Sequence, residues 1–112
     1  MTHKIDGLWI VQYNGPKGDG GGVVVLTKGQ VLGGDNGFTY IGSFNFKDPK
    51  LQARVSVRNF DSAIPNVLGV VGNFELLIEG TLERDTLTGT AALVDAPDAK
   101  MFVRLSRQFN LT

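Results

Sequence analysis

The chain has no cysteine, a single histidine and no excess of either charge. The lack of cysteine excludes disulfides, thiolate chemistry and cysteine-ligated zinc or iron–sulfur sites, and it fits a reducing compartment. Eleven lysines and arginines balance eleven aspartates and glutamates, so the basic balance of a typical nucleic-acid-binding protein is missing. No apolar run approaches the roughly 20 residues of a membrane helix, and the N-terminus lacks the apolar core of a signal peptide. We therefore expect a cytoplasmic protein that binds neither nucleic acid nor membrane.

Residues that could carry catalysis or hold a metal are also scarce. His3, the only histidine, has no second ligand at metal-binding spacing, and the serines have no histidine to act as a base. Glu75, Glu79 and Glu83 share one face of a predicted strand, where a solvated surface explains them better than acid–base work. We expect a protein that is not an enzyme and that needs no metal or cofactor.

The chain does have the periodic pattern of an all-β protein. Short runs of strand-forming residues recur about every dozen positions, separated by glycine or Asp/Asn turns. The 112 residues fit a single domain with one core. We predict eight strands, over residues 8–14, 22–27, 30–34, 38–46, 51–59, 73–83, 86–94 and 100–109. A short helix is expected near Asp61 to Gly69, with Asp61 or Ser62 as its cap and Pro65 in its first turn.

Apolar and polar residues alternate within these strands. Leu51, Ala53, Val55 and Val57 share one face of the predicted strand 51–59, and polar residues occupy the other face. This pattern is typical of a closed antiparallel sheet with one wet face. Glycines at 42, 80 and 89 lie within strands, where they permit the bends that closure requires. We therefore predict an all-β fold, an eight-stranded antiparallel closed barrel that forms one domain over residues 1–112.

A glycine-rich stretch from Gly15 to Gly21 separates the first two predicted strands. A phosphate-binding loop needs a helix N-terminus directed at the anion, whereas the strand-forming run Val-Val-Val-Leu-Thr follows here. We therefore interpret Gly15 to Gly21 as a flexible turn.

The first and last strands carry a tryptophan and two arginines. The tripeptide 7–9, Gly-Leu-Trp, opens the first strand, and the last strand bears Arg104 and Arg107. In lipocalin-like (calycin) barrels, a G-x-W opens the first strand, and an arginine of the last strand packs across the tryptophan at the closed end. Such stacking suits an indole and a guanidinium. We favour Arg107, which we expect to share a face with Phe109, and an ordinary core role for Trp9 is the alternative.

The interior of an eight-stranded barrel is either filled by side chains or holds one small ligand. Small residues at several inward positions favour some void. The residues that we expect around a ligand cavity, with the tryptophan and arginine of the closed end, are Trp9, Val11, Tyr40, Phe44, Val55, Leu76, Ile78 and Arg107. Leu8, Ile10 and Ile41 fall on outward faces, where apolar side chains often mark an interface, so we also expect a homodimer.

Several short motifs occur in the same order as in a known family. They are Asp6-Gly7, the glycine-rich stretch before Val23, Gly33-Gly34-Asp35, Tyr40-x-Gly42, Arg58-Asn59-Phe60 and Ile64-Pro65-x-Val67-Leu68. Together they cover most of the first two thirds of the chain, and the chain resembles the GrlR-type negative regulators of type III secretion, which share a short lipocalin-like barrel. The resemblance implies a dimeric barrel that binds and restrains a transcriptional activator, with a hydrophobic cavity that can hold lipid.

One departure from this family concerns the contact with the activator. A family member carries an acidic Glu-Asp-Glu-Asp cluster near the turn after the fourth strand, and that cluster is tied to activator binding. The corresponding stretch here, Asn45 to Lys50, is mixed in charge. We therefore expect any activator contact elsewhere, at Ile64, Pro65, Val67 and Leu68. The function expected first is a regulatory protein-binding module, and the alternative is a carrier or sensor of a small hydrophobic ligand such as a fatty acid.

Overall fold

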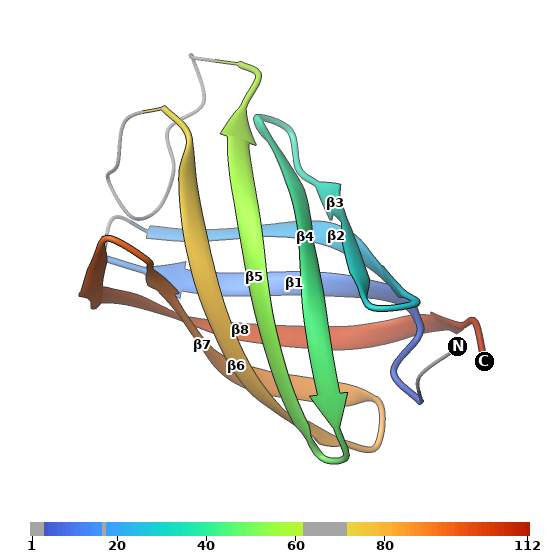
Figure 1. Cartoon of the computed structure of the whole chain (residues 1–112). Coiled ribbons are helices and arrows are strands. Elements are labelled where there is room, and N and C mark those ends of the chain that lie inside the picture. Colours follow the sequence, from blue (N-terminus) through green and yellow to red (C-terminus); the bar gives the residue numbers. More distant parts are fainter. Residues whose placement is uncertain (1–3, 17, 62–71) are drawn as a thin grey trace.

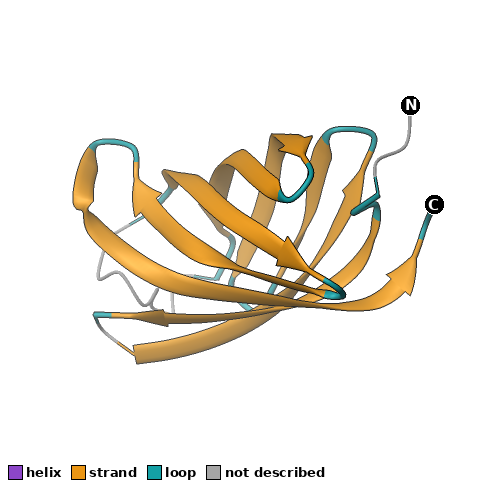
Figure 2. Ribbon diagram, turned by 90° about the horizontal axis from the view of Figure 1, so that it is seen from below, coloured by secondary structure: helices purple, strands orange, loops and turns teal. Residues whose placement is uncertain are grey.

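The computed structural model describes residues 4–16, 18–61 and 72–112, which form eight strands and no helix (Figure 1). The strands are β1 (Gly7–Gly15), β2 (Gly18–Thr27), β3 (Gln30–Gly34), β4 (Phe38–Lys47), β5 (Lys50–Asn59), β6 (Phe74–Glu83), β7 (Thr86–Leu93) and β8 (Ala96–Asn110). Each strand pairs antiparallel with the next, and β8 pairs with β1, so the sheet closes into a barrel (Figure 2). The predicted all-β, eight-stranded closed barrel is confirmed. Among the described residues, no helix has the length and hydropathy needed to cross a membrane.

Two strands, β2 and β8, begin four residues earlier than the sequence predicts. β2 begins at Gly18, and its first residues pair in register with the end of β1, with Gly18 opposite Gly15. The expected flexible turn from Gly15 to Gly21 is therefore wrong for most of its length, because a partner strand supplies hydrogen bonds that local composition does not reveal. β8 begins at Ala96 rather than at residue 100. The short helix expected near Asp61 to Gly69 falls mostly on residues 62–71, outside the described residues.

The barrel wall follows the predicted alternation. In β5 the buried positions are every second residue from Leu51 to Val57, and the residues between them face solvent or are half-buried. Gly42 shows why glycine is needed on the inner side of the wall, since a Cβ there would overlap the carbonyl oxygen of Arg54 on β5. The buried hydrophobic side chains form one core, made up of Ile5, Trp9, Val11, Val24, Leu26, Val31, Phe38, Tyr40, Phe44, Leu51, Ala53, Val55, Val57, Leu76, Leu82, Leu87, Ala91, Met101, Val103 and Leu105.

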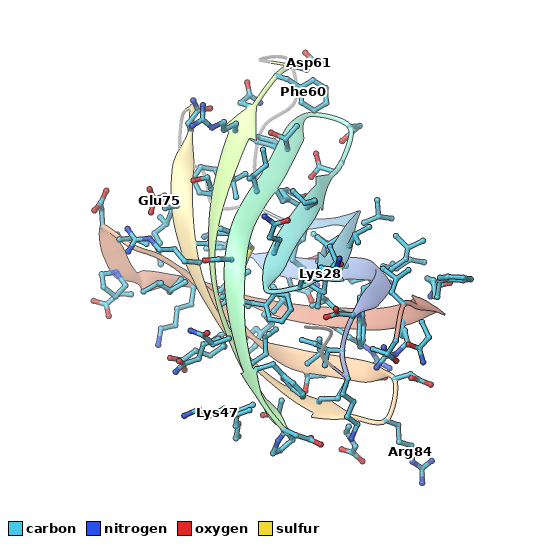
Figure 3. All side chains as sticks on the ribbon, turned by 45° about the vertical axis from the view of Figure 1, so that its right-hand side comes forward. Lys28, Lys47, Phe60, Asp61, Glu75 and Arg84 are labelled. Atoms are coloured by element: carbon cyan, nitrogen blue, oxygen red, sulfur yellow. The ribbon has the colours of Figure 1, made fainter. Side chains whose placement is uncertain are left out.

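The connections between strands alternate between the two ends of the barrel. Near the two ends of the chain, the Leu111 N–H donates a hydrogen bond of 3.0 Å to the backbone oxygen of Asp6. The turns after β2, β4 and β6 lie at this end of the barrel, which we call the terminal end. The turns after β1, β3 and β7 lie at the other end, together with the end of β5 and the start of β6, and we call it the open end. Lys47 and Arg84 accordingly lie far from Phe60 and Asp61 (Figure 3). The turn from Lys47 to Lys50 is exposed.

Candidate functional site

The inward side chains leave an internal cavity of about 230 Å³. This volume exceeds the roughly 150 Å³ of an apolar cavity known to hold benzene. The cavity reaches the surface at the open end, where the exposed Asp19 and Asn36 belong to its lining. Most of its wall is aliphatic or aromatic and comes from all the strands except β7. Its size and its mainly apolar wall match what a small apolar molecule would need.

Of the eight residues predicted to surround a ligand cavity, five belong to the lining of this cavity. They are Val11, Tyr40, Val55, Leu76 and Ile78. Trp9, Phe44 and Arg107 do not belong to its lining, so their assignment to the cavity is wrong. Trp9 and Phe44 are buried in the core instead, with exposed fractions of 0% and 5%. The cavity nevertheless extends along the barrel toward the terminal end, where Leu26, Val31 and Leu51 belong to its lining.

Trp9 and Arg107 meet at the terminal end, as the likeness to lipocalin-like barrels implies. The guanidinium carbon of Arg107 lies 4.6 Å from the centre of the Trp9 ring, within the range of a cation–π interaction. The indole N–H donates a hydrogen bond of 3.0 Å to the backbone oxygen of Ile5. Arg107 also forms an ion pair with Asp85 at 2.9 Å and donates to the backbone oxygen of Asp6 at 3.3 Å. These contacts join β8, the β6–β7 turn and the N-terminal segment over the indole.

A break in register separates Arg107 from Phe109. Trp9 pairs with Arg107, but Leu8 pairs with Phe109, so Gln108 is an extra residue on β8. Such a bulge reverses the alternation beyond it. Phe109 is accordingly 63% exposed, and the expectation that it shares the inward face of Arg107 is wrong.

A polar cluster stands in the cavity wall near its mouth. It consists of Tyr13 from β1, Asp35 from the β3–β4 turn and Tyr40 from β4. The Tyr13 hydroxyl donates to Oδ2 of Asp35 at 2.8 Å, and the Tyr40 hydroxyl donates to the same oxygen. The two hydroxyl oxygens lie 3.2 Å apart. Oδ1 of Asp35 accepts the backbone N–H groups of Gly37 and Phe38, both at 2.9 Å.

These contacts determine what the cluster can do chemically. Four donors surround Asp35, which matches the acceptor-only character of a carboxylate. Burial, the largest cause, raises the pKa of Tyr13 to about 12, with Asp35 acting in the same direction and the Tyr40 hydroxyl opposing it. Burial and the hydrogen bond to Asp35 also raise the pKa of Tyr40. Both hydroxyls therefore remain protonated at neutral pH, whereas acid–base catalysis works best with a pKa near the operating pH.

The glycine-rich run makes room for this cluster. Gly20 pairs with Tyr13 across the β1–β2 ladder, and a Cβ at Gly20 would overlap the tyrosine ring. A Cβ at Gly22 would lie 3.2 Å from both the Tyr40 ring and Cβ of Asp35. The start of β2 thus lacks side chains where aromatic rings from other strands occupy the space.

Sequence reasoning missed two members of the cluster. Tyr13 is two residues beyond Val11 on the same predicted strand, so alternation alone could have placed it inside the barrel. Asp35 could be interpreted only as a turn residue, because its tyrosine partners are 22 and 5 positions away. In the described part of the chain, no three His, Asp or Glu side chains gather as metal ligands.

The predicted dimer residues lie in a continuous apolar region outside the barrel. Leu8 pairs with Val25, Val25 with Leu32, and Leu32 with Ile41, so one row of apolar side chains crosses four strands. A second pair, Ile10 and Val23, lies beside this row. We call this surface the outer apolar patch, defined as Leu8, Ile10, Val23, Val25, Leu32 and Ile41. The residues predicted to bind an activator, Ile64, Pro65, Val67 and Leu68, lie outside the described residues.

The fold and the site define a closed eight-stranded barrel with a Trp9–Arg107 contact at the terminal end, an apolar internal cavity that reaches the surface at the open end, and a tyrosine–aspartate cluster at the cavity mouth. The chain matches no protein-family model and no curated protein.

Proposed function

We propose that this protein is a non-catalytic, lipocalin-like barrel that binds a small apolar molecule in its cavity. The observation that carries the proposal is the cavity of about 230 Å³ with largely apolar walls. Each methylene group of a ligand that leaves water contributes about 0.8 kcal/mol. The closed wall of the barrel supplies a preformed site, which reduces the cost of ordering the protein on binding. The polar residues of the cavity are concentrated at its mouth, as expected for a site that orients one end of a ligand.

An environment-sensitive apolar dye tests this function, with a variant that fills the cavity. Ala53 lines the cavity, so Ala53→Phe should abolish dye binding to the folded protein. Ala92 on β7 does not line it, so Ala92→Phe adds the same bulk elsewhere and should leave binding intact. If Ala53→Phe does not fold, the milder Ile78→Phe replaces it. A wild-type protein that binds no dye, or a folded filled variant that binds as well as wild type, would overturn the proposal.

A second function, regulation through protein contacts, is favoured by the outer apolar patch. Ile10, Val23, Leu32 and Ile41 are each at least 40% exposed, and contiguous exposed apolar surface marks interaction sites. We commit to a second copy of this chain as the occupant. A two-fold contact places like residues opposite one another, and the patch contains no charged side chain, so pairing two copies brings no like charges together. A homodimer is also what the resemblance to negative regulators of type III secretion implies.

The oligomeric state tests this second proposal directly. Light scattering at micromolar concentration should give twice the monomer mass of 12.1 kDa. Leu32→Lys, at the centre of the patch, should produce monomers that remain folded. Leu77→Lys is the matched control, because Leu77 is similarly exposed but lies on β6. A monomeric wild-type protein, or a dimer that Leu32→Lys leaves intact, would contradict the proposal.

Binding of a transcriptional activator stays a prediction that rests on the resemblance. We expect Ile64→Asp to abolish such binding without unfolding the barrel. Replacing Lys47, Asp48 and Lys50 together by alanine should leave it nearly unchanged. Co-purification of the activator from the native host, identified by mass spectrometry, measures both variants, and the opposite pattern would locate the contact on the β4–β5 turn. The cytoplasmic location also stays a prediction.

A further inference from the structure

The charged side chains at the cavity mouth are negative, and its tyrosine–aspartate cluster offers acceptors rather than donors. Asp19 and Asp35 are the only charged residues among the described lining, and no lysine or arginine belongs to it. The polar end of a ligand at the mouth would therefore lie next to negative charge only.

The tyrosine hydroxyls add to this acceptor character. Each hydroxyl has one proton, and both Tyr13 and Tyr40 direct it to Oδ2 of Asp35. What remains on each phenolic oxygen is acceptor capacity. The tyrosine cluster can therefore accept hydrogen bonds from a ligand, whereas its own two hydroxyl protons are already engaged. The Asn36 side-chain amide, also in the lining, can both donate and accept.

We propose that the ligand of the cavity is a cationic amphiphile, with an apolar body among the aliphatic residues and a protonated amine at the tyrosine–aspartate cluster. This inference rests on the proposed function as a carrier of an apolar molecule and specifies its head group. An ammonium group carries only donors, so it complements the phenolic oxygens, and its charge complements Asp35 and Asp19. A carboxylate head group carries neither a donor nor a positive charge, and it would approach two aspartates.

Three ligands with the same alkyl chain test the proposal by displacement of the apolar dye at neutral pH. The probes are a primary alkylamine, the corresponding alcohol and the corresponding carboxylate. The amine should bind at least about tenfold more tightly than the carboxylate, because charge-assisted hydrogen bonds are the stronger kind and a tenfold ratio requires only a modest free-energy difference. The preference should also weaken as salt is added, since the cluster is only part-buried.

The outcomes separate this inference from the proposed function. If none of the three probes displaces the dye, the cavity does not carry apolar molecules and both proposals fail. If all three bind equally, or if the carboxylate binds best, the carrier function stands and the head-group assignment is wrong. Specific binding of the amine supports both.

A substitution at the cluster provides a second measurement. Asp35→Asn keeps a carbonyl oxygen that can accept the two backbone N–H groups of the turn, but it removes the charge. It should reduce amine affinity about tenfold and change alcohol affinity by less than about threefold. Glu79→Gln, an exposed change on the outer face of β6, is the control and should alter neither. Undiminished amine affinity in a folded Asp35→Asn protein would overturn the assignment, and if that variant does not fold, the three wild-type affinities decide.

Discussion

The contact between Arg107 and Trp9 leads to a quantitative prediction about the terminal end. A cation–π pair is worth about 0.5–1 kcal/mol at exposed sites and about 2 kcal/mol or more when desolvated. The Arg107 side chain is only 9% exposed and Trp9 is fully buried, so the upper part of this range applies. The ion pair with Asp85 adds little, because the Asp85 side chain is 76% exposed and such pairs contribute about 0–1 kcal/mol.

The perturbation is a double-mutant cycle that pairs Arg107→Met with Trp9→Leu. Methionine keeps an unbranched apolar chain over the indole and removes the charge, whereas leucine fills part of the indole volume and removes the aromatic face. We expect Arg107→Met alone to lower the free energy of unfolding by about 1–2 kcal/mol. Trp9→Leu should cost less than the roughly 3–5 kcal/mol typical of truncation to alanine. The coupling free energy between the two changes should be about 1–2 kcal/mol.

Urea unfolding followed by far-ultraviolet circular dichroism measures the cycle, because Trp9 is the only tryptophan and its removal abolishes that fluorescence signal. Arg104→Met, three positions earlier on β8, is the control. Arg104 is exposed, so its replacement should change stability by no more than about 0.5 kcal/mol. A coupling below about 0.5 kcal/mol, the usual limit of additivity for independent sites, would refute a cation–π contact that stabilises the barrel.

Three further measurements test the wall, the cluster and the outer surface. Gly42→Ala should destabilise the barrel by about 1–3 kcal/mol in urea unfolding, because its Cβ overlaps the backbone of β5, whereas Gly80→Ala, whose Cβ lies 3.3 Å from its nearest neighbour, should cost less; equal losses would contradict this reasoning. Tyr13 and Tyr40 are the only tyrosines, and the folded pKa of Tyr13 is raised to about 12, so the unfolded chain loses its phenolic protons first and stability should fall as the pH rises from about 10 to about 12. Tyrosinate absorbance of the folded protein with a midpoint near pH 10 would disprove the buried cluster. Hydrogen exchange should be slower for the backbone of Leu32 at concentrations that favour the proposed dimer than at high dilution, and an unchanged rate would count against an interface at the outer apolar patch.

The sequence by itself determined the number of strands and which residues face inward. Alternation depends only on neighbours along the chain, because successive side chains of a strand point to opposite sides. That is why the inward positions of β5, and the outward positions of Ile10 and Ile41, were predictable. The meeting of Trp9 with Arg107 was implied by the likeness to lipocalin-like barrels, and alternation only favoured Arg107 over Arg104.

Local pattern was misleading where a partner strand decides the outcome. Glycines from Gly18 to Gly21 indicate a turn in isolation, yet they form β2 because β1 lies alongside and the Tyr13 ring needs their space. The face of Phe109 depends on one extra residue, Gln108, relative to β1. Neither fact is contained in the residues themselves, because each is a relation between two strands.

Only the tertiary structure decided where the barrel is hollow and what stands at the mouth of the hollow. A cavity remains where the side chains of facing strands do not fill the space that the barrel encloses. This balance of volumes depends on several strands together, so it cannot be predicted from one strand at a time. The sequence could therefore name Val11, Tyr40 and Val55 as inward residues without separating them from Trp9 and Phe44, which fill the core outside the cavity. The polar cluster likewise arises only when closure of the sheet brings β1, the β3–β4 turn and β4 around one space.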